Sequence, residues 1–316
     1  MTTMSKLLLC VLCTCVCVLV ITLIIFTQTR TKQEKLTNPL QNYLLPQFRR
    51  LPASHTCNTT IISAYYKIKS KHSYEEYLSW MINFLSLRDC MVIFVQPDLE
   101  ETILTLRPPA YPTLIIPRPL ESFLVAKLVD GKGWEEQEKM DPEHYPGHNK
   151  ELFWIWNEKT IMMKMVSDIN PFSSSYFVWM DIGAVRHSEY NYQLMVRNIP
   201  QESGVLLLSM EDFTDEEKIL KDGKSLADFS LVDRIGGTTI GCDQESLERW
   251  HDAYYKTMRS YLERGRFIGK DQSMMATTCL ETDLCLLVEG DKHWFRLQEW
   301  FRGKIVDKFV RINIAR

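Results

Sequence analysis

Asp181 is the residue with the clearest chemical potential, because it directly follows a short apolar segment. Residues 176–180 are aromatic, β-branched or otherwise apolar, with three serines before them and Gly183 shortly after, which is typical of a buried strand. Asp181 then stands at the carboxyl end of that strand, the edge at which open α/β sheets bind ligands. Gly183 lets a bulky ligand approach the backbone. The alternative is an ordinary turn, in which Asp181 bonds its own backbone and Gly183 supplies a positive φ.

Cations, glycines and a second aspartate add to this candidate site. Lys159 and Arg186 could each pair with a phosphate, the lysine as a point charge and the arginine through its planar fork; the alternative for Lys159 is a solvated charge on a helix. Gly236 and Gly237 would let the backbone approach a sugar, or they simply mark a bend at a strand end. Asp271 opens a helical segment, where its default role is to cap the helix.

Composition and missing motifs exclude several classes of function. The chain has 316 residues, of which 45% are hydrophobic, enough for one substantial core or two small ones. A net charge of −3 and the lack of a long basic run give no reason to expect nucleic acid as a partner. The sequence contains no Gly-x-Ser-x-Gly, His-Glu-x-x-His, Walker-loop or Gly-x-Gly-x-x-Gly pattern. This argues against hydrolase, metalloprotease and dinucleotide-binding functions.

Alternating strands and helices must position these residues. Apolar runs predict strands over residues 60–66, 91–95, 113–116, 176–180, 204–209, 235–241 and 284–288. Helices are predicted over residues 98–106 and 149–167, after Ser73, after Asp243 and in a segment opened by residues 267–272. Ser73 and Glu76 form a capping box, and the helix that follows should bury a stripe that includes Tyr74 and Ile82. Residues 130–148, rich in Gly, Pro and charges, are expected to form a loop. The alternation predicts an α/β domain with a mostly parallel sheet.

The N-terminal region reads as a membrane anchor and a stem. Residues 7–26 carry no charge and match the length of about 20 residues that spans a bilayer. A cleaved signal peptide is the competitor, but its apolar region is shorter and a small-x-small cleavage site is lacking. We therefore expect a cytoplasmic tail over residues 1–6, a transmembrane signal anchor over 7–26, a stem over 27–58 and a folded body over 59–316.

Two signals disagree about the orientation of the body. Basic residues after the span favour a cytoplasmic body, whereas Asn58 begins an Asn-Thr-Thr sequon, which is used only in the secretory lumen. Because large domains translocate largely regardless of nearby charge, we expect a lumenal body with a glycan on Asn58. Five cysteines follow the anchor, so at least one thiol is free or pairs with another chain; they are Cys57, Cys90, Cys242, Cys279 and Cys285.

Several ordered motifs together resemble the HtrL/YibB-like family. They are Ile61-Ile-Ser-Ala-Tyr-Tyr66, Asn170-Pro-Phe172, Phe177-Val-Trp-Met-Asp-Ile-Gly183 with Arg186, Gly236-Gly-Thr-Thr-Ile-Gly241 with Trp250, and Gly269-Lys-Asp-Gln272. The likeness runs from about residue 59 to 300. That family is similar to glycosyltransferases of the GT-A type, which use nucleotide sugars on a Rossmann-like sheet. The resemblance implies an enzyme that transfers a sugar to a glycan or protein acceptor. Together with the expected anchor and lumenal body, we expect this enzyme in the membrane of the Golgi or endoplasmic reticulum.

The resemblance also implies roles for individual residues. Asp181 and Gly183 match the GT-A Asp-x-Asp motif, which holds Mn²⁺ or Mg²⁺ beside the diphosphate of the donor, and His293 matches a late metal ligand. Asp271 matches a general base near the acceptor, and Gln272 would orient a sugar hydroxyl. Gly183 stands where the second carboxylate of the motif is expected, so the alternative is a catalytically silent module that binds a glycan or protein.

Overall fold

The computed structural model describes residues 56–69, 72–145, 147–305 and 308–312. The expected tail over 1–6, the membrane anchor over 7–26 and almost all of the stem lie outside these residues. Within the described ranges, no helix is long and apolar enough to cross a membrane.

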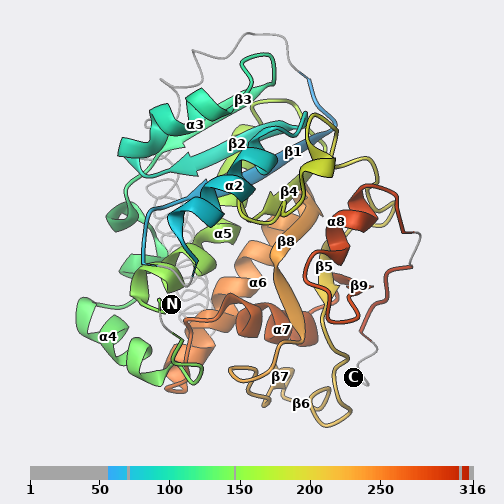
Figure 1. Cartoon of the computed structure of the whole chain (residues 1–316). Coiled ribbons are helices and arrows are strands. Elements are labelled where there is room, and N and C mark those ends of the chain that lie inside the picture. The colour runs from blue at the N-terminus through green and yellow to red at the C-terminus, as the bar shows by residue number, and fades with distance from the viewer. Residues whose placement is uncertain (1–55, 70–71, 146, 306–307, 313–316) are drawn as a thin grey trace, which may run out of the picture. The chain divides into compact units, whose positions relative to one another are not determined.

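Seven strands form one mixed sheet in the order β3-β2-β1-β4-β8-β5-β9 (Figure 1). They are β1 (Thr59–Tyr65), β2 (Cys90–Val95), β3 (Thr113–Pro117), β4 (Tyr176–Met180), β5 (Val205–Ser209), β8 (Ile235–Asp243) and β9 (Cys285–Glu289). Neighbouring strands are parallel except at β8, which runs antiparallel to both β4 and β5. The prediction of an α/β domain with a mostly parallel sheet is confirmed. A separate short hairpin, β6 (Leu220–Lys221) with β7 (Lys224–Ser225), was not predicted.

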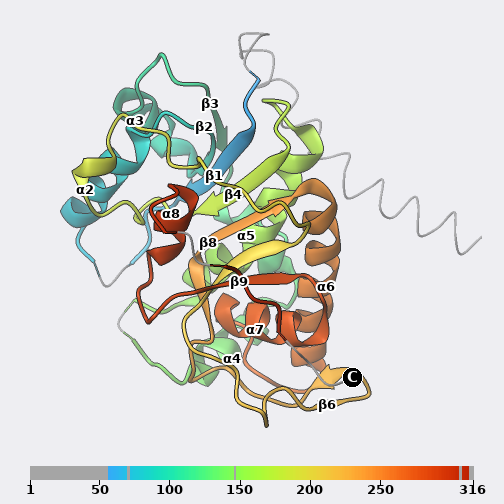
Figure 2. The same cartoon turned by 90° about the vertical axis from the view of Figure 1, so that its right-hand side faces the viewer.

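Helices cover both faces of the sheet, as the edge view in Figure 2 shows. One face carries α2 (Tyr74–Leu85), α3 (Glu100–Leu106) and α8 (Arg296–Phe301), and the other carries α5 (Lys150–Ile169), α6 (Gln244–Glu263) and α7 (Asp271–Glu281). The remaining α-helix of the described residues is α4 (Gly131–Met140); short 3₁₀ turns span Pro97–Leu99, Leu120–Ser122, Val125–Lys127 and Ser188–Tyr190. Alternate strand residues pack under α2, α3 and α8, among them the fully buried Ile61, Met91, Val178, Leu206 and Leu286. Burial on both faces explains why these strands read as continuous apolar runs.

Helix caps formed where the sequence indicated them. Ser73 accepts a hydrogen bond from the Glu76 backbone N–H, and the Glu76 carboxylate accepts one from the Ser73 N–H, which completes the capping box before α2. Asn149 and Asp243 cap α5 and α6 in the same way through their side-chain oxygens. Asp271, in contrast, is not a cap, because it is the first residue inside α7 and the capping position belongs to Lys270.

Two local predictions were wrong. The segment over residues 130–148 is not a loop throughout, because Gly131–Met140 form α4. Asp130 caps that helix by accepting the Gly133 N–H, and Trp134 is fully buried, so capping and burial outweigh the poor helix propensity of the glycines. The stripe predicted for α2 was also wrong in part. Its members Met81 and Leu85 are buried as expected, together with Phe84, but Tyr74 and Ile82 are exposed.

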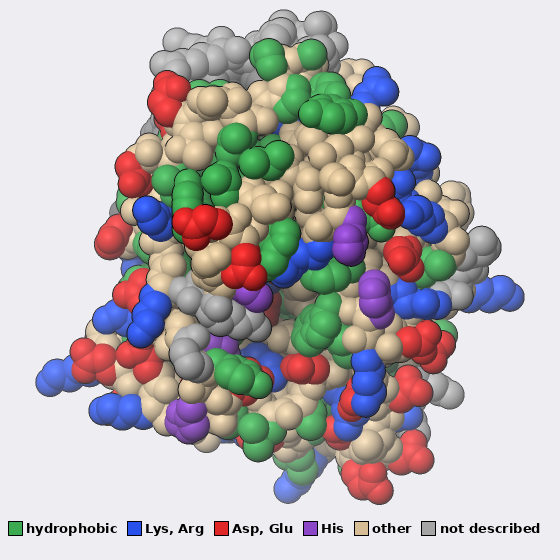
Figure 3. Space-filling view, in the orientation of Figure 1, with side chains coloured by type: hydrophobic (Ala, Val, Ile, Leu, Met, Phe, Trp, Pro, Cys, Tyr) green, Lys and Arg blue, Asp and Glu red, His purple; other side chains and the backbone are tan. Residues whose placement is uncertain are grey.

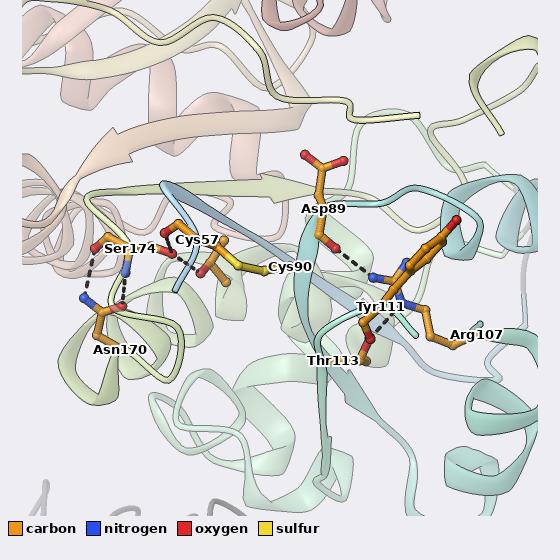
Figure 4. Close-up of a disulfide and its surroundings, with 9 residues drawn as sticks. Cys57, Asp89, Cys90, Arg107, Tyr111, Thr113, Asn170 and Ser174 are labelled. Carbon is orange, nitrogen blue, oxygen red and sulfur yellow. Dashed lines mark hydrogen bonds between the residues drawn. A yellow bond between two sulfur atoms is a disulfide. The ribbon is translucent and has the colours of Figure 1, made fainter. Parts of the chain in front are cut away.

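A disulfide closes the amino edge of the sheet (Figure 4). Cys57, just before β1, is bonded to Cys90, the first residue of β2. Close by, the Ser174 hydroxyl donates to the Cys57 carbonyl at 2.7 Å, and the Asn170 side chain binds the backbone of Ser174 on both sides. The starts of β1, β2 and β4 are thus tied together.

Arg107 also stabilises this amino edge, near the starts of β2 and β3 (Figure 4). This buried guanidinium donates to the carbonyls of Leu85, Leu87 and Asp89 and to the hydroxyl of Thr113. Burial lowers the pKa of the Arg107 guanidinium to about 10. These contacts join the end of α2 to the starts of β2 and β3. The polar side chains at the amino edge thus serve to hold the fold together.

A second disulfide joins Cys279 in α7 to Cys285 at the start of β9, and Cys242 remains as a buried thiol. The odd cysteine expected from the count is therefore Cys242.

Candidate active site

Asp181 lies at the carboxyl edge of the sheet, directly after β4. Its backbone N–H donates to the Thr238 carbonyl at 2.9 Å, which extends the pairing of β4 with β8 by one residue. The Ala184 N–H donates to the Asp181 carbonyl at 2.8 Å and closes a turn. The Asp181 side chain is 36% exposed, and its Oδ1 accepts the indole N–H of Trp179 at 2.8 Å. The predicted turn is present, but the Asp181 carboxylate contacts the Trp179 indole and the Lys159 ammonium and does not bond its own backbone.

Gly183 is required by packing rather than by an unusual backbone angle. Its φ is not among the positive values of the described residues. A Cβ added there would lie 3.2 Å from the Tyr77 ring and 3.3 Å from the Trp80 ring. Because two aromatic rings of α2 fill this space, a carboxylate at position 183 would not fit without moving them.

Gly237 reaches the same edge because β8 is antiparallel, so that the beginning of β8 lies beside the end of β4. The Gly237 carbonyl accepts a hydrogen bond from Lys159 Nζ at 2.8 Å, and a Cβ added to Gly237 would lie 2.9 Å from Asp271 Oδ2. Gly236 instead packs against Leu208. Of the two glycines singled out from the sequence, only Gly237 borders the charged groups directly.

Lys159 is the centre of the site. It projects from α5 and is 3% exposed, and its Nζ lies 3.2 Å from Asp181 Oδ1 and 3.0 Å from Asp271 Oδ2. With the Gly237 carbonyl, this makes three acceptors for an ammonium that has three donors. The interpretation of Lys159 as a solvated surface charge is wrong. That Lys159 binds a phosphate stays a prediction; in this arrangement two carboxylates already balance the charge of the ammonium.

Asp271 enters the site from the first turn of α7. It is buried, its Oδ1 accepts the Gln272 N–H at 2.9 Å, and its Oδ2 forms an ion pair with Lys159 that lacks the geometry of a directed hydrogen bond. The Gln272 amide nitrogen donates to Asp233 and to the Ile235 carbonyl, both at 3.0 Å. The amide nitrogen of Gln272 thus already donates two hydrogen bonds to protein groups at the edge of the site.

Burial and charge act against each other in this cluster. Burial alone would lower the pKa of Lys159, but the charges of Asp181 and Asp271 outweigh it and the pKa lies above its ordinary value. Burial raises the pKa of Asp271, against the opposing effect of Lys159. Lys159 therefore stays charged, while Asp271 takes up a proton more readily than an exposed aspartate does.

Arg186 is a second cation at the same edge. Its guanidinium lies 3.2 Å from the centre of the Trp80 ring and 5.3 Å from that of Phe295. Among the described residues, its buried Nε has no hydrogen-bond partner. The rings hold the planar fork in place, and in the described part of the chain its two terminal nitrogens form no ion pair with a carboxylate.

His293 lies near this edge without being assembled into a metal site. It is exposed, and its ring contacts that of Phe295. The next residue, Trp294, accepts the Thr238 hydroxyl through its carbonyl at 3.1 Å. In the part of the chain that the structure describes, no group of three or more His, Cys, Asp or Glu side chains is placed to hold a metal ion.

The space-filling view shows a hollow near the centre of the face seen in Figure 1, with acidic, basic and histidine side chains at its margin (Figure 3). The ribbons of β4 and β8 cross the centre of the same view.

Sequence reasoning missed several neighbours of these residues. Trp179 belongs to the strand that was predicted to be buried, and it is buried, but its indole N–H also donates to Asp181. Lys270 forms ion pairs with Glu143 and Asp233 beside Gln272. Lys159 stands in a polar run with Asn157, Glu158 and Thr160, all of which are buried, so no local signal in the sequence marked this lysine as buried.

The comparison with known proteins identifies a family but no activity. A family model described as "Bacterial protein of unknown function (HtrL_YibB)" matches residues 131–303. The match covers more than half of the chain and includes Lys159, Asp181, Arg186, Gly237 and Asp271, but it begins later than the resemblance suggested. No curated protein matches the sequence.

Proposed function

This chain belongs to the HtrL/YibB family, and from that premise we propose that it is a glycosyltransferase that moves a sugar from a nucleotide sugar to a glycan or protein acceptor. The fold we propose is of the GT-A type. The observation that carries the proposal is the meeting of Asp181 and Asp271, from distant parts of the chain, at the carboxyl edge of one sheet.

The topology supports a nucleotide at this edge. The strand order begins β3-β2-β1-β4, so the connections reverse direction between β1 and β4. In doubly wound sheets, ligands bind in the crevice outside the carboxyl ends of the strands at such a switch point. Asp181 follows the carboxyl end of β4, and Tyr65 ends β1, so both residues stand at the strand ends that flank this switch point.

The residues present can serve each part of a transfer reaction. Arg186 would bind the diphosphate of the donor through its planar fork. Asp271 would accept the proton of the acceptor hydroxyl while the acceptor oxygen bonds to the sugar carbon. The bond from that carbon to the phosphate oxygen breaks in the same reaction, and the nucleoside diphosphate leaves with its electron pair. The raised pKa of Asp271 suits a general base.

The divalent metal implied by the GT-A resemblance does not fit the residues present. Gly183 supplies no carboxylate, the rings of Tyr77 and Trp80 fill the space beside it, and Lys159 already neutralises Asp181. The transfer we propose therefore uses only side chains of this protein.

A catalytically silent binding module is the second candidate. The Asp271 side chain is only 5% exposed and is held by Lys159, so it resembles a structural ion pair. An acceptor hydroxyl could reach this carboxylate only if the surrounding groups shifted. In this alternative, Arg186 and the aromatic rings beside it would bind a glycan or protein without turnover.

We also propose that the body is lumenal, in the Golgi or endoplasmic reticulum, behind the anchor expected over residues 7–26. Two disulfides support an oxidising compartment, and Asn58 is exposed.

The decisive experiment is a screen of donor nucleotide sugars with the purified full-length chain, scoring hydrolysis and transfer to glycan acceptors. Turnover that is lost in Asp271→Asn is the expected result. Binding of a nucleoside diphosphate without turnover of any donor would favour the silent module, and no nucleotide binding at all would contradict a transferase.

A further inference from the structure

We propose that the ammonium of Lys159 occupies the cation position of this site, and that the protein binds a nucleoside diphosphate without Mn²⁺ or Mg²⁺. The part that concerns the nucleotide rests on the proposed function. The part that concerns the cation stands on the geometry alone.

The ammonium sits where a bridging cation would sit. Its Nζ lies 3.2 Å from Asp181 Oδ1, 3.0 Å from Asp271 Oδ2 and 2.8 Å from the Gly237 carbonyl oxygen. Two carboxylates and a backbone carbonyl are the hard oxygen ligands that Mg²⁺ and Mn²⁺ prefer. Lys159 thus takes up the oxygens from which a metal site would be built.

Adding a metal to these oxygens would bring two cations together. A divalent ion on Asp181 and Asp271 would meet a buried ammonium whose pKa is held up by those same carboxylates. Like charges repel strongly where water is excluded. Lys159 is anchored on α5 and is 3% exposed, so it cannot simply turn into solvent to make room.

The neighbouring groups do not offer a substitute set of ligands. Asp181 Oδ1 also accepts the Trp179 indole N–H at 2.8 Å, which further satisfies that oxygen. The rings of Tyr77 and Trp80 close the space beside Gly183, where the GT-A motif would place a second carboxylate.

Charge on a diphosphate would instead be balanced by Arg186. Its guanidinium is stacked on Trp80, and in the described part of the chain no carboxylate pairs with it. An arginine fork provides several donors in a fixed plane and needs no metal to bind a phosphate.

The cation part is tested with Mn²⁺ alone, by titrating the full-length protein and following the signal of free Mn²⁺ by electron paramagnetic resonance. The wild-type protein should show no Mn²⁺ site that depends on Asp181. Lys159→Ala frees the two carboxylates and should gain one Mn²⁺ site, which Lys159→Ala with Asp181→Asn should lose again. Lys164→Ala is the matched control, because this lysine of the same helix pairs with Asp168 and should gain no site.

Two results would overturn the cation part. One is a Mn²⁺ site in the wild-type protein that disappears in Asp181→Asn. The other is a folded Lys159→Ala that gains no site. If Lys159→Ala does not fold by itself, refolding in the presence of Mn²⁺ should rescue it, and failure of that rescue counts against the proposal.

The nucleotide part is tested separately by measuring the Kd of ADP, CDP, GDP and UDP in EDTA and in Mn²⁺. The Kd of the preferred nucleotide should agree within about twofold between the two conditions, and Arg186→Lys should weaken it by about tenfold or more. A nucleotide that binds only with Mn²⁺ overturns the metal-free claim. If no nucleotide binds in either condition, the proposed function fails, while the Mn²⁺ titration still decides the role of Lys159.

Discussion

Asp181 and Asp271 lie on either side of one ammonium group, at 3.2 Å and 3.0 Å from Lys159 Nζ. Asp181 is partly exposed, whereas Asp271 is almost completely buried. The two carboxylates therefore share a cation but differ in their access to solvent, so they are suited to different tasks.

Replacing Asp271 by Asn should separate catalysis from folding. Asn keeps the shape of the side chain but removes the charge, and Lys159 keeps Asp181 as a partner. We expect the thermal unfolding temperature to change little and nucleotide binding to survive. Transfer should fall by roughly 10² to 10⁴, the usual effect of losing a general base.

Asp243→Asn is the matched control, since Asp243 caps α6 at the opposite edge of the sheet and Asn caps a helix about as well as Asp. It should leave transfer unchanged. Normal transfer by Asp271→Asn would remove the assignment of the base.

The pH dependence of transfer should have an acid limb set by Asp271. Burial raises its pKa above the ordinary value of 3.8, although Lys159 acts in the opposite direction. Because a base works only when ionised, the initial rate should fall as the pH falls through this raised pKa. The free energy of unfolding responds with the opposite sign, because the folded chain binds the Asp271 proton more tightly than the unfolded chain does. The contribution of Asp271 to stability is therefore present at low pH and is lost as the pH rises through the folded pKa. An acid limb retained in the residual rate of Asp271→Asn would assign it to another group.

Gly237→Ala should damage the site through one methyl group. The added Cβ would lie 2.9 Å from Asp271 Oδ2, so the carboxylate must move away from Lys159. Overpacking of this kind costs about 1–3 kcal/mol of unfolding free energy, and transfer should drop at least about tenfold. Gly131→Ala is the control, because nothing lies within 4 Å of its added Cβ. Comparing the rates and the denaturant midpoints of both variants tests this. Full activity of Gly237→Ala would mean that the ion pair is irrelevant to transfer.

The two disulfides should contribute unequally to stability. The cysteines of the Cys57–Cys90 pair are 33 residues apart and those of Cys279–Cys285 are 6 apart. Loop-closure entropy then predicts that replacing the first pair by alanine lowers the unfolding free energy by about 3–4 kcal/mol and the second by about 2 kcal/mol. Denaturant unfolding of both double variants measures the difference. Equal losses would mean that local packing, and not loop length, decides their effect.

Glycosylation of Asn58 should occur before the chain folds. Asn58 is exposed, but the hydroxyl of Thr60, which completes the sequon, is buried and bonded to the Ser174 hydroxyl at 2.7 Å. Endoglycosidase should shift the mobility of the wild-type protein but not that of Asn58→Gln. Digestion of the C-terminal body by protease added to intact microsomes would show the opposite orientation.

Local patterns in the sequence were sufficient for the elements and for part of the site. The strand over residues 176–180, the capping box of Ser73 and the cap at Asp243 were predicted from neighbouring residues alone, because apolar runs and caps depend on short-range geometry. The position of Asp181 after a buried strand followed from the same patterns.

The contacts of Lys159, Gly237 and Asp271 were decided only by the tertiary structure. The antiparallel direction of β8 brings Gly237 beside the end of β4, and the packing of α5 against the sheet carries Lys159 between the two carboxylates. A single sequence does not reveal strand direction or which charge meets which, because these depend on contacts between segments that are far apart in the chain. For the same reason, a lysine that reads as a solvated helix residue is the buried cation at the centre of the site.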